Sequence, residues 1–319
     1  MAYKQGLSDD FVAALNSLHE EPSGGWWPKM LSDPDLFVAV RNNYLNVYYR
    51  GCSLARISFD IGAVVVDTHY KYLVKPRLKK EYVRAVGGTF QLQSQWPNGF
   101  ADPFTTALSD IAALKAAAKP YAGEEKKLVG KVIGSHSNVV DVEIALTKDA
   151  EEATEAEPSK GSSAKRIDIA ALRWQDARPV LDFYEAKLFG NKEIRADGDA
   201  KVIDQIATYK TLLAKYEIDI RIGFIRSCEN VVALNGISAA RQDMARAVLA
   251  AAGRDALLVN VEPILIVGGF DADQRDGPVW KKHRAKLEGA LGPHRVLLAG
   301  SAKSVKLGRG VPPKEGRGS

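Results

Sequence analysis

The sequence predicts an α/β protein in which a mixed β-sheet core is flanked by helices and follows an antiparallel, β-rich N-terminal region. Short runs of β-branched and aromatic residues separated by turns fill residues 36–75. Residues 123–226 instead alternate between helical and strand-like periodicity. Apolar residues make up 46% of the chain and charged residues 26%, a composition that supports a packed core.

The N-terminal region, residues 1–118, begins with a predicted helix over residues 8–18, for which Ser8 is a suitable N-cap. The segment EPSGGWWP interrupts the chain after this helix. The runs LFVAV, YLNVYY, SLARISF and AVVVDTHYKYLV then predict an antiparallel meander, with Arg50-Gly51 as one of its turns. Residues 105–118 predict a helix that ends before Pro120.

The second region, residues 119–300, has the element order of a mixed sheet. We expect closely spaced strands to pair antiparallel, and a strand that follows a crossover helix to pair parallel. An acidic and then Ser/Gly-rich segment, 147–165, predicts a flexible hairpin tip, and 301–319 predicts a basic, disordered tail. The expected helices are 123–134, 198–216, 236–252 and 278–291, and the expected strands are 138–146, 165–174, 180–189, 219–226, 262–270 and 295–300.

Acidic and basic residues are distributed unevenly along the chain. The formal net charge is +5 and the pI is near 9.0, which is compatible with a nucleic-acid partner without requiring one. Residues 149–157 hold five acids and no base, whereas basic residues cluster in 71–80 and 303–317. A solvated surface is the alternative interpretation of each run.

Several classes of protein are not indicated. No apolar run reaches the ~18–20 residues needed to span a bilayer, and the first residues lack the apolar stretch of a signal peptide. We therefore expect a cytoplasmic protein without a membrane partner. Cys52 and Cys228 lie far apart without a zinc-binding pattern, so we expect both to be buried as small apolar residues. The five histidines lack ligand spacing, and neither a phosphate loop nor a nucleophile elbow occurs.

Asp168, Glu185 and Lys187 form the candidate site. Asp168 lies on the second predicted strand of the core, and Glu185 and Lys187 lie on the third. Because side chains alternate along a strand with period 2, Glu185 and Lys187 point to one face. Two adjacent strands can then present two carboxylates to one Mg²⁺, with the carbonyl of Ala186 as a further ligand. Lys187 could hold or deprotonate the attacking water and offset negative charge on the phosphate.

The position of these charges is the physical reason to infer function. Glu185 and Lys187 interrupt an apolar run, LDFYEAKLF, in a strand expected to be interior. Charged groups there are unfavourable unless they are paired or bind a metal. The alternative is a strand on which both residues face water. The Glu-x-Lys spacing alone is not specific, since it also occurs at Glu124-Lys126 and Glu125-Lys127.

Together these residues resemble the PD-(D/E)XK nuclease superfamily, which has the restriction-endonuclease-like fold. The resemblance rests on Ile167-Asp168, on Glu185-Ala186-Lys187, and on Gln205 and Tyr209, which match the Gln-x-x-x-Tyr motif of the RecB-like branch. Residues 44–59, followed by VDVEIAL and RIDIAAL, also resemble bacterial members of the superfamily. The proline that often precedes the first motif acid is absent, since Ile167 stands there. The motifs cover residues 123–226, about a third of the chain.

The resemblance implies roles for further residues. Gln205 and Tyr209, at i and i+4 of a helix, would anchor the site or the substrate phosphate; the alternative is a buried Tyr209 and a solvated Gln205. Members often add a glutamate from the preceding helix, for which Glu125 is our choice and Glu124 the next, with a solvated helix face as the alternative. Asp141 and Glu143 share one strand face and could supply another acid.

The resulting expectation is a Mg²⁺- or Mn²⁺-dependent nuclease that hydrolyses nucleic acid, DNA in preference to RNA. A non-catalytic binding module that keeps the fold is the alternative. A third interpretation is an effector of an antiphage defence or mobile-element system, in which residues 1–118 dock a protein partner; a homodimer is also compatible. Candidates for substrate contacts outside the motifs, each with core or solvated surface as the alternative, are Arg50, Arg56, 71–80, Tyr44, Tyr48, Tyr49, Trp26, Trp27 and 281–284.

Overall fold

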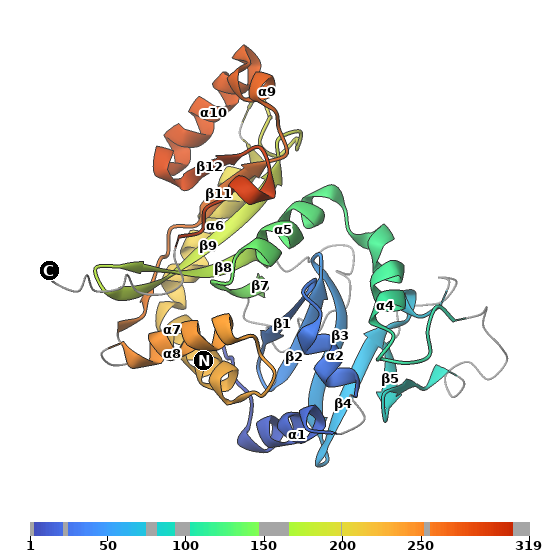
Figure 1. Ribbon diagram of the computed structural model, residues 1–319. Helices are drawn as coiled ribbons and strands as arrows, with labels where there is room; N and C mark the ends of the chain where they lie inside the picture. Colours follow the sequence, from blue (N-terminus) through green and yellow to red (C-terminus); the bar gives the residue numbers. More distant parts are fainter. Residues whose placement is uncertain are drawn as a thin grey trace, which may run out of the picture. The chain divides into compact units, whose positions relative to one another are not determined.

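The computed structural model describes residues 3–21, 25–74, 82–92, 103–146, 166–198, 200–251 and 256–308 (Figure 1). It has a mixed α/β architecture with two sheets. This confirms the predicted α/β class and the antiparallel N-terminal sheet. The chain divides into two compact units. The N-terminal unit comprises Lys4–Gly123 with Arg226–Ala245, and the C-terminal unit comprises Glu124–Ile225 and Arg246–Ser319 with Met1–Tyr3.

The sheet of the N-terminal unit is the predicted antiparallel meander, extended by two further strands. Its strands pair in sequence order, each antiparallel to the next. The predicted turn at Arg50-Gly51 has positive φ at both residues, as two-residue hairpins with the right-handed twist require. The strands are β1 (Leu36–Val40), β2 (Tyr44–Tyr49), β3 (Cys52–Asp60), β4 (Ala63–His69), β5 (Tyr82–Val86) and β6 (Thr89–Phe90).

Two predicted helices occur in this unit. Helix α1 (Asp9–His19) begins after Ser8, whose side chain accepts a hydrogen bond from the Phe11 N–H, as predicted. Helix α4 (Ile111–Ala118) is shorter than the predicted 105–118, because the Asp110 side chain accepts a hydrogen bond from the Ala113 N–H and so starts the helix there. The other helices of this segment are α2 (Trp26–Ser32), η1 (Tyr70–Tyr72) and η2 (Lys119–Tyr121).

The N-terminal unit also contains residues that we assigned to the second region, 119–300. These are the end of α7 (Glu217–Ala233) and the beginning of α8 (Ala239–Ala250). The Asn230 side chain accepts a hydrogen bond from the Leu7 N–H at 2.9 Å, and Arg241 donates to the Val38 carbonyl at 3.1 Å. The predicted boundary at residue 118 missed this return of the chain, because such long-range contacts leave no local pattern.

The C-terminal unit is built on a mixed sheet with the order β12-β11-β9-β8-β7. Strands β7, β8 and β9 pair antiparallel, whereas β11 pairs parallel with both β9 and β12, and β10 pairs parallel with β9. Central strand β9 is buried at every residue from 179 to 187. The strands are β7 (Val139–Ala145), β8 (Arg166–Gln175), β9 (Arg178–Leu188), β10 (Leu258–Val259), β11 (Ile264–Gly268) and β12 (Val296–Ala299).

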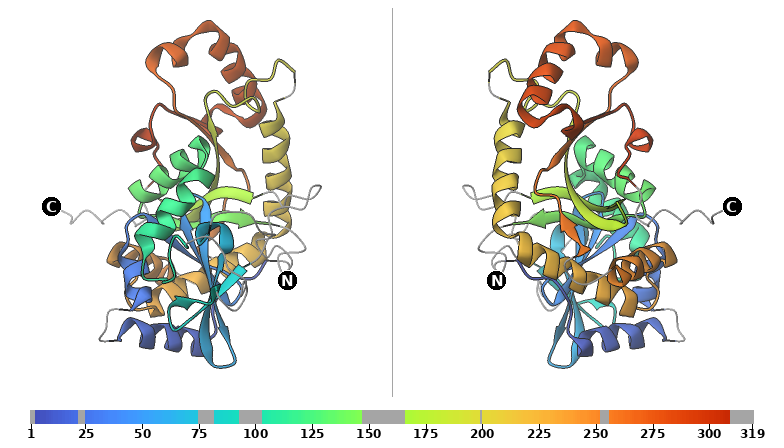
Figure 2. Two further views of the ribbon diagram at one scale, coloured as in Figure 1. Left: turned by 90° about the vertical axis from the view of Figure 1, so that its right-hand side faces the viewer. Right: turned by 90° about the vertical axis from the view of Figure 1, so that its left-hand side faces the viewer.

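Helices α5 (Glu124–Ser135) and α6 (Lys201–Lys215) lie on opposite sides of this sheet (Figure 2). Ile206 of α6 and Trp280 of α10 (Pro278–Leu291) pack with Leu265 of β11 in one apolar core. All three helices agree closely with the predicted ranges. The remaining short helices are α9 (Ala272–Asp276), η4 (Pro293–Arg295) and η5 (Ala302–Ser304).

The predicted strand 219–226 is wrong: these residues belong to helix α7. Their alternation of apolar and polar residues suggested a strand, but burial follows the helical period. Ile220 and Phe224 are buried four residues apart, whereas Ile218 and Ile222 are exposed. The strands that pair parallel with β9 after the crossover are instead β10 and β11.

The prediction of a disordered tail is wrong for residues 301–308. Val305 and Leu307 are buried, and the Asn138 side chain donates a hydrogen bond to the Leu307 carbonyl at 3.1 Å. Two apolar residues thus anchor a segment that composition alone assigned to solvent. The predicted acidic hairpin 147–165, the end of the tail from residue 309, and most of the basic run 71–80 lie outside the described residues.

Two expectations, about the cysteines and about membrane-spanning helices, can be examined in the described part of the chain. Cys52 and Cys228 are buried, as expected, and form no disulfide with each other. Among the described helices, none combines the length and the apolar character that crossing a membrane requires.

Candidate active site

The mixed sheet opens between β8 and β9 at the predicted site. The ladder between these strands runs from Gln175↔Arg178 to Ile169↔Tyr184 and stops there. Beyond that point β8 continues to pair with β7, and β9 continues to pair with β11. Asp168, Glu185 and Lys187 all lie where the two strands have separated.

Asp168 bridges this opening. Its Oδ2 accepts a hydrogen bond of 2.8 Å from the N–H of Ala186. The residue is half-buried. Burial raises the pKa of Asp168 well above its ordinary value, and the negative charges of Glu185 and Glu143 raise it further. The carboxyl groups of Asp168 and Glu185 are therefore close enough to repel one another.

Glu185 is buried, with 2% of its surface exposed. Its Oε1 accepts a hydrogen bond of 2.8 Å from Gln205 and lies 2.9 Å from Nζ of Lys187. Its Oε2 is buried and has no hydrogen-bond partner among the described residues. Burial raises the pKa of Glu185 to about 7, although Lys187 and Gln205 act in the opposite direction. An unsatisfied carboxylate oxygen in the interior is unfavourable and needs an explanation.

Lys187 lies among three glutamates. Its Nζ is 2.9 Å from Glu185 Oε1, 3.0 Å from Glu193 Oε2 and 3.6 Å from Glu125 Oε1. Burial lowers the pKa of Lys187, but the attraction of these carboxylates outweighs burial and raises the pKa above its ordinary value. Lys187 is therefore an ammonium ion in this arrangement, which suits the stabilisation of negative charge rather than the removal of a proton from water.

Gln205 and Tyr209 come from α6 and meet the site as predicted from their i, i+4 spacing. Gln205 Nε2 donates to the Tyr209 hydroxyl at 2.8 Å as well as to Glu185. The Tyr209 hydroxyl donates to the Arg166 carbonyl of β8 at 2.6 Å. This chain of hydrogen bonds fixes the Glu185 carboxylate relative to both α6 and β8. Burial, with a contribution from Glu185, raises the pKa of Tyr209, so its hydroxyl keeps its proton.

Glu125 joins the site from the first turn of α5. Its Oε2 accepts hydrogen bonds from the Asn191 side chain at 2.8 Å and from the Leu188 N–H at 3.3 Å. Glu124, the other candidate, instead pairs with Lys127 on the exposed side of the helix. The structure thus distinguishes between two neighbouring glutamates that the sequence left open.

Asn191 and Glu193 were missed by sequence analysis. They follow β9 in a turn, where Asn191 Oδ1 accepts a hydrogen bond of 2.9 Å from the Glu193 N–H. Asn191 also donates a hydrogen bond to Glu125, and Glu193 forms an ion pair with Lys187. No motif or periodicity marks these two residues, because the path of the turn brings them back to the site.

Glu143 of β7 also lies beside the site. The pairs Val142↔Ile169 and Ile144↔Ile167 place it opposite Asp168 in the ladder. Its φ is +52°, which is rare for a residue other than glycine and is found where the surroundings impose it. Asp141, the other predicted acid of this strand, is buried, and its Oδ1 accepts a hydrogen bond from the Val142 N–H at 2.7 Å.

The other candidates do not join this cluster. Arg56 lies over the ring of Tyr44 and Arg50 over that of Tyr49, both within the N-terminal unit. Tyr48, Tyr49 and Trp27 are buried, which supports their interpretation as core residues. Residues 281 and 282 are exposed on α10, and Arg284 pairs with Glu288 at 2.8 Å.

The donor set can be compared with what a divalent cation requires. Among the described residues, no group of three or more His, Cys, Asp or Glu side chains has a metal-site arrangement. The predicted set consists of two carboxylates, Asp168 and Glu185, with a backbone carbonyl of Ala186. The unpartnered Glu185 oxygen and the mutual repulsion of the two acids are both features that a bound Mg²⁺ or Mn²⁺ would relieve. The residues present therefore fit such an ion.

Comparisons of the chain with protein-family models, curated proteins and solved structures found no match.

The raised pKa of Glu185 leads to a test of this electrostatic arrangement. The unfolded chain loses the Glu185 proton near its ordinary value of 4.5, and the folded chain loses it at about 7. Between these values the folded state holds more protons, so the free energy of unfolding falls as pH rises. We expect Glu185→Gln to become progressively more stable relative to wild type between pH 4.5 and 7. Urea unfolding in EDTA at several pH values measures this difference, and a difference independent of pH contradicts the arrangement.

Proposed function

We propose that the protein is a Mg²⁺- or Mn²⁺-dependent nuclease of the restriction-endonuclease-like type, which hydrolyses phosphodiester bonds of nucleic acid, DNA in preference to RNA. One observation carries the proposal. Where β8 and β9 separate, a buried Glu185 oxygen that has no hydrogen-bond partner in the described part of the chain lies beside Asp168 and a lysine ammonium. This combination is unfavourable for stability, and such unfavourable groups concentrate at functional sites.

Asp168 and Glu185 are the residues that would hold the ion, with the Ala186 carbonyl as a further ligand. A bound divalent cation supplies Lewis-acid polarisation of a phosphoryl oxygen. Glu125 and Glu193 add negative charge around Lys187, which further favours a cation in this part of the unit. The carboxylates alone would repel a phosphate, so the positive charge of Lys187 and of the ion is needed to bring substrate close.

Lys187 is the residue that would act on the substrate. As an ammonium ion with three possible donors, it can hold the attacking water or a phosphate oxygen and offset the charge that develops there. Gln205 and Tyr209 are positioning residues, since they contact Glu185 and each other. Asn191 and Glu193 are positioning residues as well, since Asn191 donates a hydrogen bond to Glu125 and Glu193 pairs with Lys187.

The charge of the chain supports a polyanionic substrate. The net charge is +5 although the chain carries 39 acidic residues, and basic side chains such as those of Lys281 and Lys282 remain exposed. Incubation with supercoiled plasmid, linear duplex, single-stranded DNA and RNA, each with Mg²⁺, Mn²⁺ or EDTA, tests the proposal. We expect cleavage with either metal and none with EDTA. Absence of cleavage on every substrate, or cleavage unaffected by EDTA, contradicts it.

Tyr209→Phe tests the positioning role of the α6 residues. The change removes the hydroxyl that donates to the Arg166 carbonyl and accepts from Gln205, so Glu185 loses part of its support. We expect cleavage to fall about tenfold and the free energy of unfolding to fall by about 1–2 kcal/mol. Tyr216→Phe, at the C-cap of α6 about two turns after Tyr209, is the matched control. Equal activities of both variants would show that the Tyr209 hydroxyl does not support the site.

A further inference from the structure

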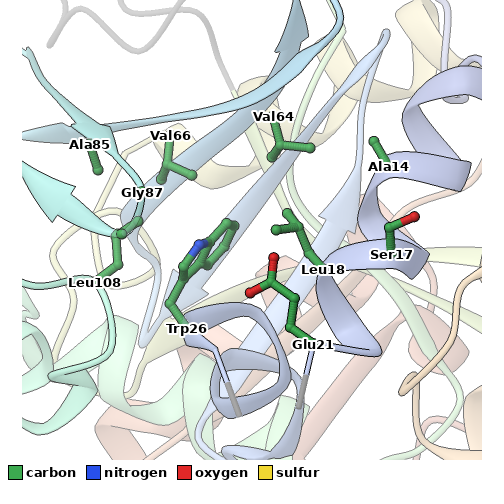
Figure 3. A pocket seen from close by; sticks show the side chains of 11 residues that line it. Ala14, Ser17, Leu18, Glu21, Trp26, Val64, Val66, Ala85, Gly87 and Leu108 are labelled. Atoms are coloured by element: carbon green, nitrogen blue, oxygen red, sulfur yellow. The ribbon is translucent and has the colours of Figure 1, made fainter. Parts of the chain in front are cut away.

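The N-terminal unit contains a cavity of about 280 Å³ that is separate from the acidic site (Figure 3). The end of α1 and the start of α2 form one side, and β4, β5 and the β5–β6 turn form the other. All of its lining residues belong to the N-terminal unit. Its size is at the low end of ligand sites, which suits a single ring or a short chain.

The side chains that line the cavity are mostly apolar, and one aromatic and one acidic side chain stand out among them. Most of the wall is aliphatic, from Leu18, Val64 and Leu108 among others. Against it lie one indole, that of Trp26, and one carboxylate, that of Glu21, side by side in Figure 3. Among the described residues the Glu21 carboxylate makes neither a hydrogen bond nor an ion pair. The cavity thus combines an apolar body with a single carboxylate at its solvent-exposed side, unpaired among the described residues.

The fold brings the β5–β6 turn directly against the indole. Gly88 has a φ of +79°, and a Cβ atom there would lie 3.2 Å from Cδ1 of Trp26. Glycine at this position lets the turn close over the ring edge without displacing it. The absence of a side chain at Gly88 therefore leaves room for the indole between this turn and Glu21.

We propose that this cavity binds a small organic cation, with an ammonium or guanidinium group at Glu21 and an apolar or aromatic body against Trp26. A carboxylate attracts the charge, and the face of an indole attracts the same cation through its quadrupole. Aliphatic walls accept the uncharged remainder of the ligand. A neutral ring that only donates hydrogen bonds to Glu21 would match the walls but would leave the charge of Glu21 uncompensated.

Benzylamine, which is protonated at neutral pH, is the probe, and benzyl alcohol is its neutral counterpart of similar shape. The full chain has five tryptophans, so its ¹H–¹⁵N spectrum has five indole N–H signals, and Trp26→Leu identifies one of them by its loss. Titration of each probe while following the Trp26 signal gives its affinity. The spectrum also shows that each variant remains folded.

We expect benzylamine to bind wild type at least about fivefold more tightly than benzyl alcohol, and Glu21→Gln to remove most of this preference. Asp10→Asn, which removes one charge from the exposed start of α1, is the matched control and should bind as wild type does. Equal affinity for both probes, or an unchanged affinity in Glu21→Gln, overturns the proposal. None of these outcomes depends on cleavage, so failure here leaves the proposed nuclease site untouched.

Discussion

Replacement of Glu185 by glutamine is expected to lower cleavage by at least about 10³-fold. Glu185 is one of only two carboxylates in the predicted ligand set, and its Oε2 is the buried oxygen without a described partner. Glutamine keeps the size and the Oε1 acceptor for Gln205 but removes the negative charge that holds a divalent ion. Loss of the ion removes several kcal/mol of transition-state stabilisation, which corresponds to a rate effect of about this size.

The fold should survive this change. Removal of this buried charge relieves its desolvation and its repulsion from Asp168, but it also breaks the ion pair with Lys187. Lys187 keeps Glu193 and Glu125 as partners, so we expect the free energy of unfolding at pH 7 to change by less than about 2 kcal/mol. Glu124→Gln, on the exposed side of α5, is the matched control and should cleave as wild type does. The account fails if Glu185→Gln is folded and retains wild-type activity.

Replacement of Lys187 by methionine is expected to lower cleavage by about 10²–10³-fold while metal binding is retained or strengthened. Methionine keeps the length and apolar stem of lysine but lacks the ammonium that would offset charge on the phosphate. In the present arrangement that ammonium also pairs with Glu185 at 2.9 Å, so it competes with any other cation for this carboxylate. Lys187→Met should therefore separate catalysis from metal binding, which Glu185→Gln should not.

Cleavage assays and Mn²⁺ titration of the same preparation measure both effects. Lys127→Met, which removes an exposed lysine that pairs with Glu124, is the control for loss of a positive charge near the site. If Lys187→Met loses metal binding together with activity, Lys187 supports the structure of the site rather than the substrate. If it cleaves normally, Lys187 has no part in the reaction.

Local patterns predicted most of the C-terminal unit. Alternation along LDFYEAKLF placed Glu185 and Lys187 on one strand, and the i, i+4 spacing placed Gln205 and Tyr209 together. Both depend only on the geometry of one element. The pattern failed at 219–226, where alternate apolar residues fit a strand as well as a helix and the packing of Ile220 and Phe224 decided between them.

Features that depend on distant contacts were not predictable. The opening between β8 and β9 follows from β7 and β11 each pairing with one of the two strands beyond Ile169 and Tyr184. The positions of Asn191 and Glu193 follow from a turn, and the burial of Val305 and Leu307 follows from packing of the chain end. None of these features corresponds to a spacing of residues that could be seen in the sequence. The roles of the site residues in catalysis remain predictions that the variants above test.

The central claim is that Asp168 and Glu185 together hold one divalent ion. Calorimetric titration of Mn²⁺ into the metal-free full chain at pH 8, where Glu185 is ionised, measures this directly. The account predicts saturable binding of about one ion per chain in wild type, and loss of that binding in folded Glu185→Gln and Asp168→Asn. Absence of saturable binding in wild type, or binding that both variants retain, would contradict it.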